Sequence, residues 1–143
     1  MILYLDTSAL VKAYVTEDGS AAVLAAMNKA DAVATHLIAF VETNAAFARL
    51  FRERVLNEKQ RDALKLEFAR DWENYIQVGV DEALVRRASD LAEAFALRAY
   101  DGVHLAAADL LLKQSGVGVG FACFDRKLSR AAAVLGLPLA QEA

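Results

Sequence analysis

Four acidic residues stand at positions where their carboxylates could act together. Asp6 directly follows five apolar residues, and Asp125 follows a second, continuously apolar run over 117–124. Short apolar runs that end in polar residues are typical of buried strands, and the carboxyl ends of parallel strands share one edge of a sheet. Glu42 lies in the second turn of one expected helix, and Asp101 lies in the first turn of another. We therefore expect these four acids to lean over the same crevice.

Four carboxylates within a few ångströms repel one another and raise one another's pKa values. Such a cluster makes sense mainly if divalent cations occupy it, and hard oxygen ligands are what Mg²⁺ and Mn²⁺ prefer. A bound cation lowers the pKa of a water molecule and stabilises the charge that develops during phosphoryl chemistry. The four acids therefore predict hydrolysis of phosphodiester bonds by a metal-activated water, with Asp6, Glu42, Asp101 and Asp125 as metal ligands and catalytic residues.

Each acid also has an ordinary structural explanation when it is taken alone. Asp6 suits a turn at a strand end, and Asp125 suits the N-cap of a last helix. Glu42 alone is a solvated charge at a helix edge, and the helix macrodipole favours Asp101 near a helix start without any ligand. Only the order in which all four occur favours the catalytic interpretation.

The elements that must position these acids alternate along the chain. Apolar segments predict strands at 1–5, 32–35, 76–80, 117–124 and 138–140, and helical periodicity fills the stretches between them. Thr7 or Ser8 is expected to cap the first helix. Asn57 and Gln60 form a capping-box pattern, so the helix after them is expected to pack as a hairpin against a helix over 37–55. This alternation predicts an α/β fold with a mostly parallel, five-stranded sheet and helices on both faces.

Composition sets outer limits on the function. The chain has 143 residues, one cysteine and a formal net charge of −3, so one domain over 1–143 without an internal disulfide is expected. A single cysteine fits a reducing cytosol, and no apolar run is long enough for a membrane segment, so a cytoplasmic protein is expected. Proteins that hold nucleic acid by diffuse electrostatics alone are usually basic, which disfavours that class.

Four short motifs carry a resemblance to a known family. They are Asp-Thr-Ser-Ala-Leu-Val-Lys at 6–12, Glu42 beside Asn44, Tyr-Asp-Gly-Val-His-Leu-Ala-Ala-Ala at 100–108, and Cys-Phe-Asp-Arg-Lys-Leu at 123–128. In this order, and over essentially the whole chain, they resemble the PIN-domain ribonucleases, and most closely the VapC toxins of bacterial and archaeal toxin-antitoxin pairs.

The resemblance implies several properties. These are a five-stranded parallel sheet, an acidic quartet at the positions named above, Mg²⁺- or Mn²⁺-dependent cleavage of RNA, homodimerisation, and inhibition by a VapB-type antitoxin. Two positions depart from the family pattern. Gly102 stands where alanine is usual, which is expected to loosen the first turn below Asp101. Cys123 stands where many members have Ser or Thr, so a hydroxyl near the last acid is expected to be missing.

Other function classes fit the sequence less well. A non-catalytic PIN-like binding module is expected to lack one or more of the acids, and all four are present. A stand-alone RNA-processing PIN nuclease without an antitoxin remains open. A haloacid-dehalogenase-type phosphatase would show Asp-x-Asp after the first strand, whereas Asp6 is followed by Thr7 and Ser8. A receiver domain would need an acidic pair at the first strand and a late lysine that this chain lacks.

Several further residues have weaker expectations attached to them. Thr7 and Ser8 are supporting residues, since a hydroxyl turned toward the acids would orient a water molecule. His104 is expected to be a half-buried packing residue outside the catalytic set, and Phe47 and Phe51 are expected to form an exposed apolar contact surface. No stacking platform for RNA bases is visible. The basic residues that could meet phosphates are Lys12, Arg49, Arg52, Arg98, Arg126, Lys127 and Arg130.

Overall fold

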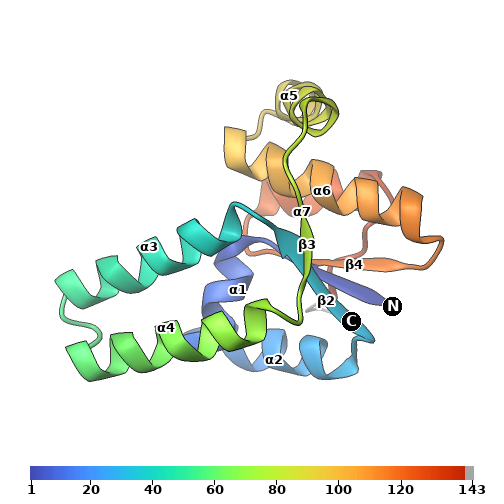
Figure 1. The fold of residues 1–143 in the computed structure, drawn as a ribbon. Coiled ribbons are helices and arrows are strands. Elements are labelled where there is room, and N and C mark those ends of the chain that lie inside the picture. Colours follow the sequence, from blue (N-terminus) through green and yellow to red (C-terminus); the bar gives the residue numbers. More distant parts are fainter. Residues whose placement is uncertain (141–143) are drawn as a thin grey trace.

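The protein folds around a parallel sheet. The computed structural model describes residues 1–140 (Figure 1). Its four strands are β1 (Ile2–Leu5), β2 (Ala32–His36), β3 (Ile76–Val78) and β4 (Val119–Ala122), in the order β3-β2-β1-β4. All three pairings are parallel, and Ile2 lies opposite both Ala32 and Val119. The expected α/β class is confirmed.

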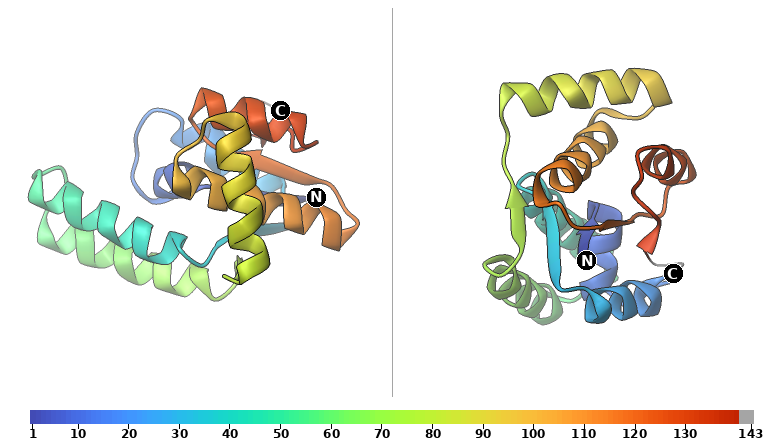
Figure 2. Two further views of the ribbon diagram at one scale, coloured as in Figure 1. Left: turned by 90° about the horizontal axis from the view of Figure 1, so that it is seen from above. Right: turned by 90° about the vertical axis from the view of Figure 1, so that its right-hand side faces the viewer.

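Helices cover both faces of this sheet (Figure 2). One group comprises α1 (Thr7–Tyr14), α2 (Ser20–Lys29), α3 (Ala39–Arg52) and α4 (Glu58–Trp72), and the other comprises α5 (Glu82–Phe95), α6 (Ala99–Ser115) and α7 (Arg126–Val134). The capping box at Asn57 is present, and α3 and α4 pack as the expected hairpin. Within residues 1–140, no helix combines the length and the apolar character that a membrane crossing needs.

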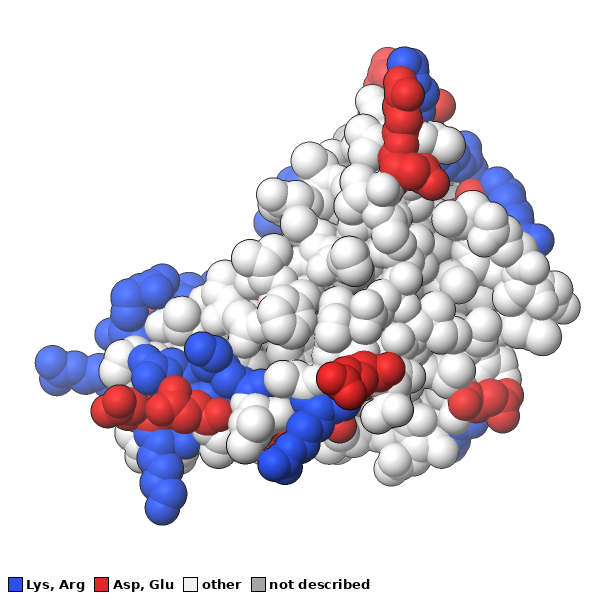
Figure 3. Space-filling model, viewed as in Figure 1, with Lys and Arg blue, Asp and Glu red and all other residues white. Residues whose placement is uncertain are grey.

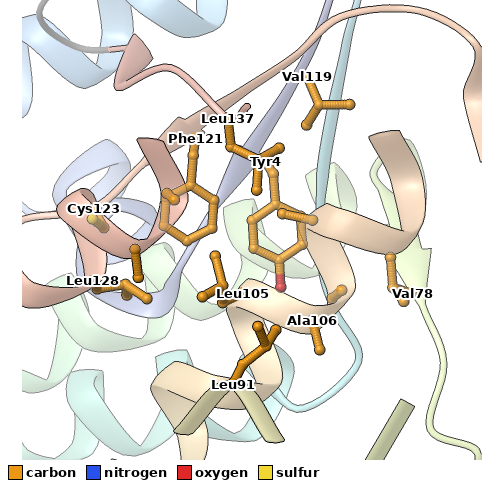
Figure 4. Close-up of a cluster of buried hydrophobic side chains, with 14 of the residues drawn as sticks. Tyr4, Val78, Leu91, Leu105, Ala106, Val119, Phe121, Cys123, Leu128 and Leu137 are labelled. Carbon is orange, nitrogen blue, oxygen red and sulfur yellow. The ribbon is translucent and has the colours of Figure 1, made fainter. Parts of the chain in front are cut away.

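The central strand β1 divides the core into two halves because its side chains alternate between the two faces of the sheet. Leu3 and Leu5 pack with the residues of α1 to α4. Tyr4 points to the other side, where its ring stacks on Phe121 of β4 with 5.5 Å between centroids (Figure 4). Burial on both faces explains why β1 and β4 are continuously apolar.

The expected fifth strand is reduced to one bridge. Among the described residues, the 138–140 segment pairs with the sheet only through Leu139 opposite Phe121. The Phe121 N–H donates to the Pro138 carbonyl at 2.8 Å, but Pro138 has no N–H to return and cannot extend the ladder. The sheet therefore has four strands rather than five, and β3 and β4 are shorter than the expected 76–80 and 117–124 strands.

The strand order creates one crevice. The chain runs outward from β1 to β2 and β3, and then returns to place β4 on the other side of β1. In such sheets ligands bind outside the carboxyl ends of the two strands at this switch point. Asp6 follows β1 there, and its N–H donates to the Ala122 carbonyl at 3.1 Å. The expected cap at Thr7 or Ser8 is wrong, because Asp6 itself caps α1 and the helix begins at Thr7.

Candidate active site

All four acids line one cavity of about 300 Å³ at this switch point. Asp6 comes from the end of β1, Glu42 from the first turn of α3, Asp101 from the first turn of α6, and Asp125 from the loop after β4. Because α3 begins at Ala39 rather than at residue 37, Glu42 stands in the first helical turn and not in the expected second. The cavity is also lined by Thr7, Ser8, Arg98, Tyr100, His104 and Phe124.

Asp6 is the most deeply buried of the four acids. Its Oδ1 accepts from the backbone N–H of Ala9 at 2.9 Å and from the Ser8 hydroxyl at 2.7 Å. Within residues 1–140 its Oδ2 accepts no hydrogen bond. Burial raises the pKa of Asp6 above its ordinary value, although His104 and the hydrogen bonds at Oδ1 oppose the rise. A positive charge inside the cavity would therefore stabilise this carboxylate.

Asp101 and Asp125 each have one oxygen engaged. Asp125 Oδ1 accepts from the Leu128 N–H at 2.9 Å and so caps α7. Asp101 Oδ2 accepts from Arg98 Nε at 3.1 Å. The Arg98 side chain is 83% exposed, and ion pairs that water reaches so freely are weak and exchange readily. The engaged oxygens hold both carboxylates in place without consuming their second oxygens.

Glu42 is the partly exposed end of a hydrogen-bonded chain that runs into the core. Its Oε1 accepts from the Thr7 hydroxyl at 2.7 Å and lies 3.0 Å from His104 Nε2. On the other side of the imidazole, His104 Nδ1 lies 2.7 Å from the Tyr4 hydroxyl. With the ring proton on Nε2, His104 donates to Glu42 and accepts from Tyr4, which assigns every contact a donor and an acceptor. Burial alone would raise the pKa of Glu42, but the bonds from His104 and Thr7 hold it below its ordinary value.

His104 is therefore more than the half-buried packing residue expected from the sequence. His104 is only 2% exposed, and its ring packs edge-on against the ring of Tyr4. The sequence signal was present, since His104 follows Asp101 by three residues and so lies nearly one helical turn further along α6. Its partners could not be found from spacing, because Tyr4 and Glu42 are 100 and 62 residues away.

Other expectations need correction. Phe47 is fully buried and cannot belong to an exposed contact surface. Cys123 lies 3.2 Å from the Ser129 hydroxyl, so a hydroxyl is present near the last acid although position 123 lacks one. Gly102 allows a close helix contact, because an added Cβ would lie 2.7 Å from the Ala88 carbonyl oxygen of α5. Asp109, which no sequence pattern singled out, is buried and paired with Arg87 and Lys113.

The donor set suits a hard divalent cation. Each of the four acids keeps one carboxylate oxygen that accepts no hydrogen bond from the described residues, and such oxygens are ligands that Mg²⁺ and Mn²⁺ prefer. However, no three His, Cys, Asp or Glu side chains within residues 1–140 are close enough to form a ready metal site. The carboxylates are therefore the right kind of ligand for such a cation, but they must come closer together than they are here to bind one.

The chain is therefore a parallel α/β domain with four acids gathered at the switch point of its sheet. The family is shown by comparison with known sequences, since the PIN domain model matches residues 3–134. The chain belongs to the PIN domain family, and the resemblance carried by its four motifs is confirmed.

Two curated relatives are similar over nearly the full length. Ribonuclease VapC45 and Ribonuclease VapC49, from two strains of Mycobacterium tuberculosis, are each 34% identical to this chain over 97% of its length and 94% of theirs. Two solved structures share the fold. FitAcB from Neisseria gonorrhoeae has a TM-score of 0.66 at 21% identity, covering 97% of this chain and 96% of that one. FitAB bound to an IR36 DNA fragment has a TM-score of 0.68 at 20% identity, covering 97% and 93%.

Proposed function

We propose that this protein is a metal-dependent endoribonuclease and the toxin of a VapC-like toxin-antitoxin pair. The observation that carries the proposal is the lining of one cavity by four carboxylates from four separate segments of the chain. The names of the two mycobacterial relatives support RNA as the substrate. The buried, raised-pKa carboxyl of Asp6 supports a requirement for a cation.

The residues of the cavity divide the work. Asp6, Glu42, Asp101 and Asp125 would hold Mg²⁺ or Mn²⁺ through their second oxygens. When bound, the cation supplies an activated water and neutralises charge on the phosphoryl group. Ser8 and Thr7 are supporting residues, because their hydroxyls fix Asp6 Oδ1 and Glu42 Oε1. These hydrogen bonds orient the two carboxylates in advance, which is one way in which a site lowers a reaction barrier, although the four acids must still come closer together to hold a cation.

The test is cleavage of a panel of transfer, ribosomal and messenger RNAs with Mg²⁺, with Mn²⁺ or with chelator. We expect cleavage only with metal, and none by Asp6→Asn, which removes one charge at nearly constant shape. The matched control is Asp18→Asn, an exposed acid away from the cavity, which should cut as the wild type does. Full activity of folded Asp6→Asn would refute the assignment. Metal-dependent cleavage by a protein whose neighbouring gene encodes no inhibitor would favour a stand-alone processing nuclease.

The proposed antitoxin would block the cavity itself. Four carboxylates attract a guanidinium group, which pairs with carboxylates in bidentate geometry. We therefore expect a VapB-like partner that places an arginine or lysine among the acids. Co-expression with the product of the neighbouring gene should give a complex that does not cut RNA. A stable complex that cuts at the rate of the free protein would contradict this occlusion.

The proposed homodimer would use a different surface. Leu37, Phe40, Val41 and Val80 are exposed around an apolar hollow of about 490 Å³, and the central part of the face in Figure 3 carries few charges. Homodimer interfaces are depleted of charge and rich in apolar area. This surface replaces the one expected at Phe47 and Phe51. Light scattering should show a dimer, and Val41→Glu should give a folded monomer. A dimer that persists in Val41→Glu would place the interface elsewhere.

A further inference from the structure

A second hollow continues from the acidic cavity. This groove has a volume of about 730 Å³ and shares Thr7, Ser8, Glu42, Arg98 and Phe124 with the cavity. The groove differs from the cavity in charge, because its lining contains four basic side chains and only two acidic ones. The cations are Lys12, Arg49, Arg52 and Arg98, and the anions are Glu17 and Glu42. The groove therefore leads from a negative cavity onto a positive surface.

One face of α3 forms a wall of this groove. Glu42, Ala45, Arg49 and Arg52 recur at intervals of three or four residues, so they lie on one side of the helix. Arg49 and Arg52 stand about 10 and 15 Å along the axis from Glu42, at 1.5 Å per residue. Both are exposed, and neither forms an ion pair with any described residue. Figure 3 shows basic side chains around the outer end of the α3–α4 hairpin, with acidic side chains between them.

Two exposed aromatic rings line the acidic cavity, and one of them, Phe124, also lines the groove. Phe124 is 42% exposed and directly precedes Asp125, and Tyr100 is 57% exposed and directly precedes Asp101. Phe124 is held in place, since Lys12 Nζ lies 4.7 Å from its ring centroid and an added Cβ at Gly19 would lie 2.7 Å from its ring. The sequence concealed this pair because 24 positions separate the two residues, which only the fold brings to one cavity.

We infer that the groove and the two rings form a binding subsite for single-stranded RNA, with Phe124 as the principal stacking residue. The inference rests on the proposed nuclease function and deepens it. Grooves that combine backbone-tracking cations with exposed aromatic rings bind single strands, because unpaired bases stack on the rings. A duplex keeps its bases stacked within the helix and offers none to Phe124 or Tyr100. Arg49 and Arg52, well away from Glu42, meet phosphates other than the one that is cut.

The experiment measures binding separately from cleavage. Fluorescence anisotropy with a labelled ten-nucleotide single-stranded RNA, in chelator, follows the wild type and the variants over a series of salt concentrations. Phe124→Ala should weaken binding by about 5- to 150-fold, the range of one base stack. Phe124→Leu should weaken binding as much as Phe124→Ala does, whereas Phe124→Trp, which keeps an aromatic ring, should bind as tightly as the wild type. The double change Arg49→Gln with Arg52→Gln should make the fall of the logarithm of the association constant with the logarithm of salt concentration less steep, by about 1.4 in slope. The matched control, Lys65→Gln with Arg70→Gln on α4, should leave the slope unchanged.

Each outcome decides the inference. Wild-type affinity in folded Phe124→Leu would overturn it, because the ring would then only fill space. Equal affinity for the single strand and its duplex would overturn it too. If the wild type binds no RNA while these substitutions weaken its complex with the neighbouring gene product, the groove is a protein-docking surface and the inference fails. Cleavage of the same RNA in Mn²⁺ is measured separately. If Phe124→Ala weakens RNA binding but the wild type cuts no RNA, only the proposed function is refuted. If the wild type cuts RNA but Phe124→Ala binds it as tightly as the wild type does, only the inference is refuted.

Discussion

Removing the hydroxyl of Tyr4 should weaken both the fold and the acidic site. The Tyr4→Phe change keeps the ring that stacks on Phe121, so packing is preserved. It deletes only the group 2.7 Å from His104 Nδ1. Because Tyr4 is fully buried and His104 nearly so, no water replaces the lost partner. The perturbation therefore removes one end of the chain that holds Glu42, together with the interactions of this hydroxyl with Thr35 and the His36 backbone.

The magnitude follows from this geometry. A buried acceptor left without a donor costs about 1–3 kcal/mol, and Phe in place of Tyr regains little of it because the ring area is unchanged. We expect Tyr4→Phe to lower the free energy of unfolding by about 1–3 kcal/mol. Without the Tyr4 hydroxyl, the His104 ring is held less firmly against Glu42. RNA cleavage should therefore fall, while the affinity for RNA stays unchanged.

Urea denaturation of the metal-free protein at pH 7 measures this effect. The matched control is Tyr100→Phe, whose hydroxyl is exposed and makes no hydrogen bond to the described residues, and which should shift stability by less than about 0.5 kcal/mol. In a double-mutant cycle, Tyr4→Phe should cost far less in a His104→Leu background, because contacting residues couple. Equal costs of Tyr4→Phe with and without His104 would refute the hydrogen-bonded chain.

Three further predictions concern the same region. Gly102→Ala should destabilise the protein by about 0.5–2 kcal/mol in thermal or urea unfolding, because overpacking against the Ala88 carbonyl exceeds the gain in helix propensity; Gly79→Ala, which has open space around it, is the control, and a stabilised Gly102→Ala would count against the contact. Burial raises the pKa of Asp6 in the folded protein, so ionisation of this carboxyl costs stability as pH rises through and above its unfolded pKa of about 3.9. Metal-free Asp6→Asn should therefore gain stability relative to wild type as pH rises from 3 to 7, and a difference that is constant with pH would contradict the cause. His104→Gln should lower the cleavage rate only modestly, since His104 holds Glu42 rather than acting as the base; a loss of several orders of magnitude in a pH-rate profile would place it in the catalytic set.

The acids could be found from the sequence because local patterns mark them. Asp6 and Asp125 follow apolar strands, and Asp101 begins a helix, so their places at the sheet edge depend only on local structure and parallel pairing. Glu42 was the weakest of the four, because its position near the start of a helix put it at this edge but its surroundings on α3 resemble any helix edge. The positions of the four acids at one cavity agree with the structure, because each position was inferred from residues of a single strand or helix.

Contacts between distant elements could not be predicted in the same way. The chain from Tyr4 through His104 to Glu42 joins β1, α6 and α3, and its partners are determined by strand order rather than by spacing. Tyr100 and Phe124 likewise come to line one cavity only in the folded protein. The error in the fifth strand has a local cause, since Pro138 offers an acceptor but no donor to β4. Burial of Phe47 depended on how α4 packs over α3.

The central claim is that the carboxylates act as one unit in cutting RNA. The most direct measurement is kcat/KM for RNA cleavage in Mn²⁺ by wild type, Asp6→Asn, Asp125→Asn and the double variant, at matched folding. Residues that act as a unit give strongly non-additive losses. We predict that each single change abolishes nearly all activity and that the double variant is no slower than the slower single variant. Losses that multiply, or a single variant that keeps wild-type activity, would contradict the account.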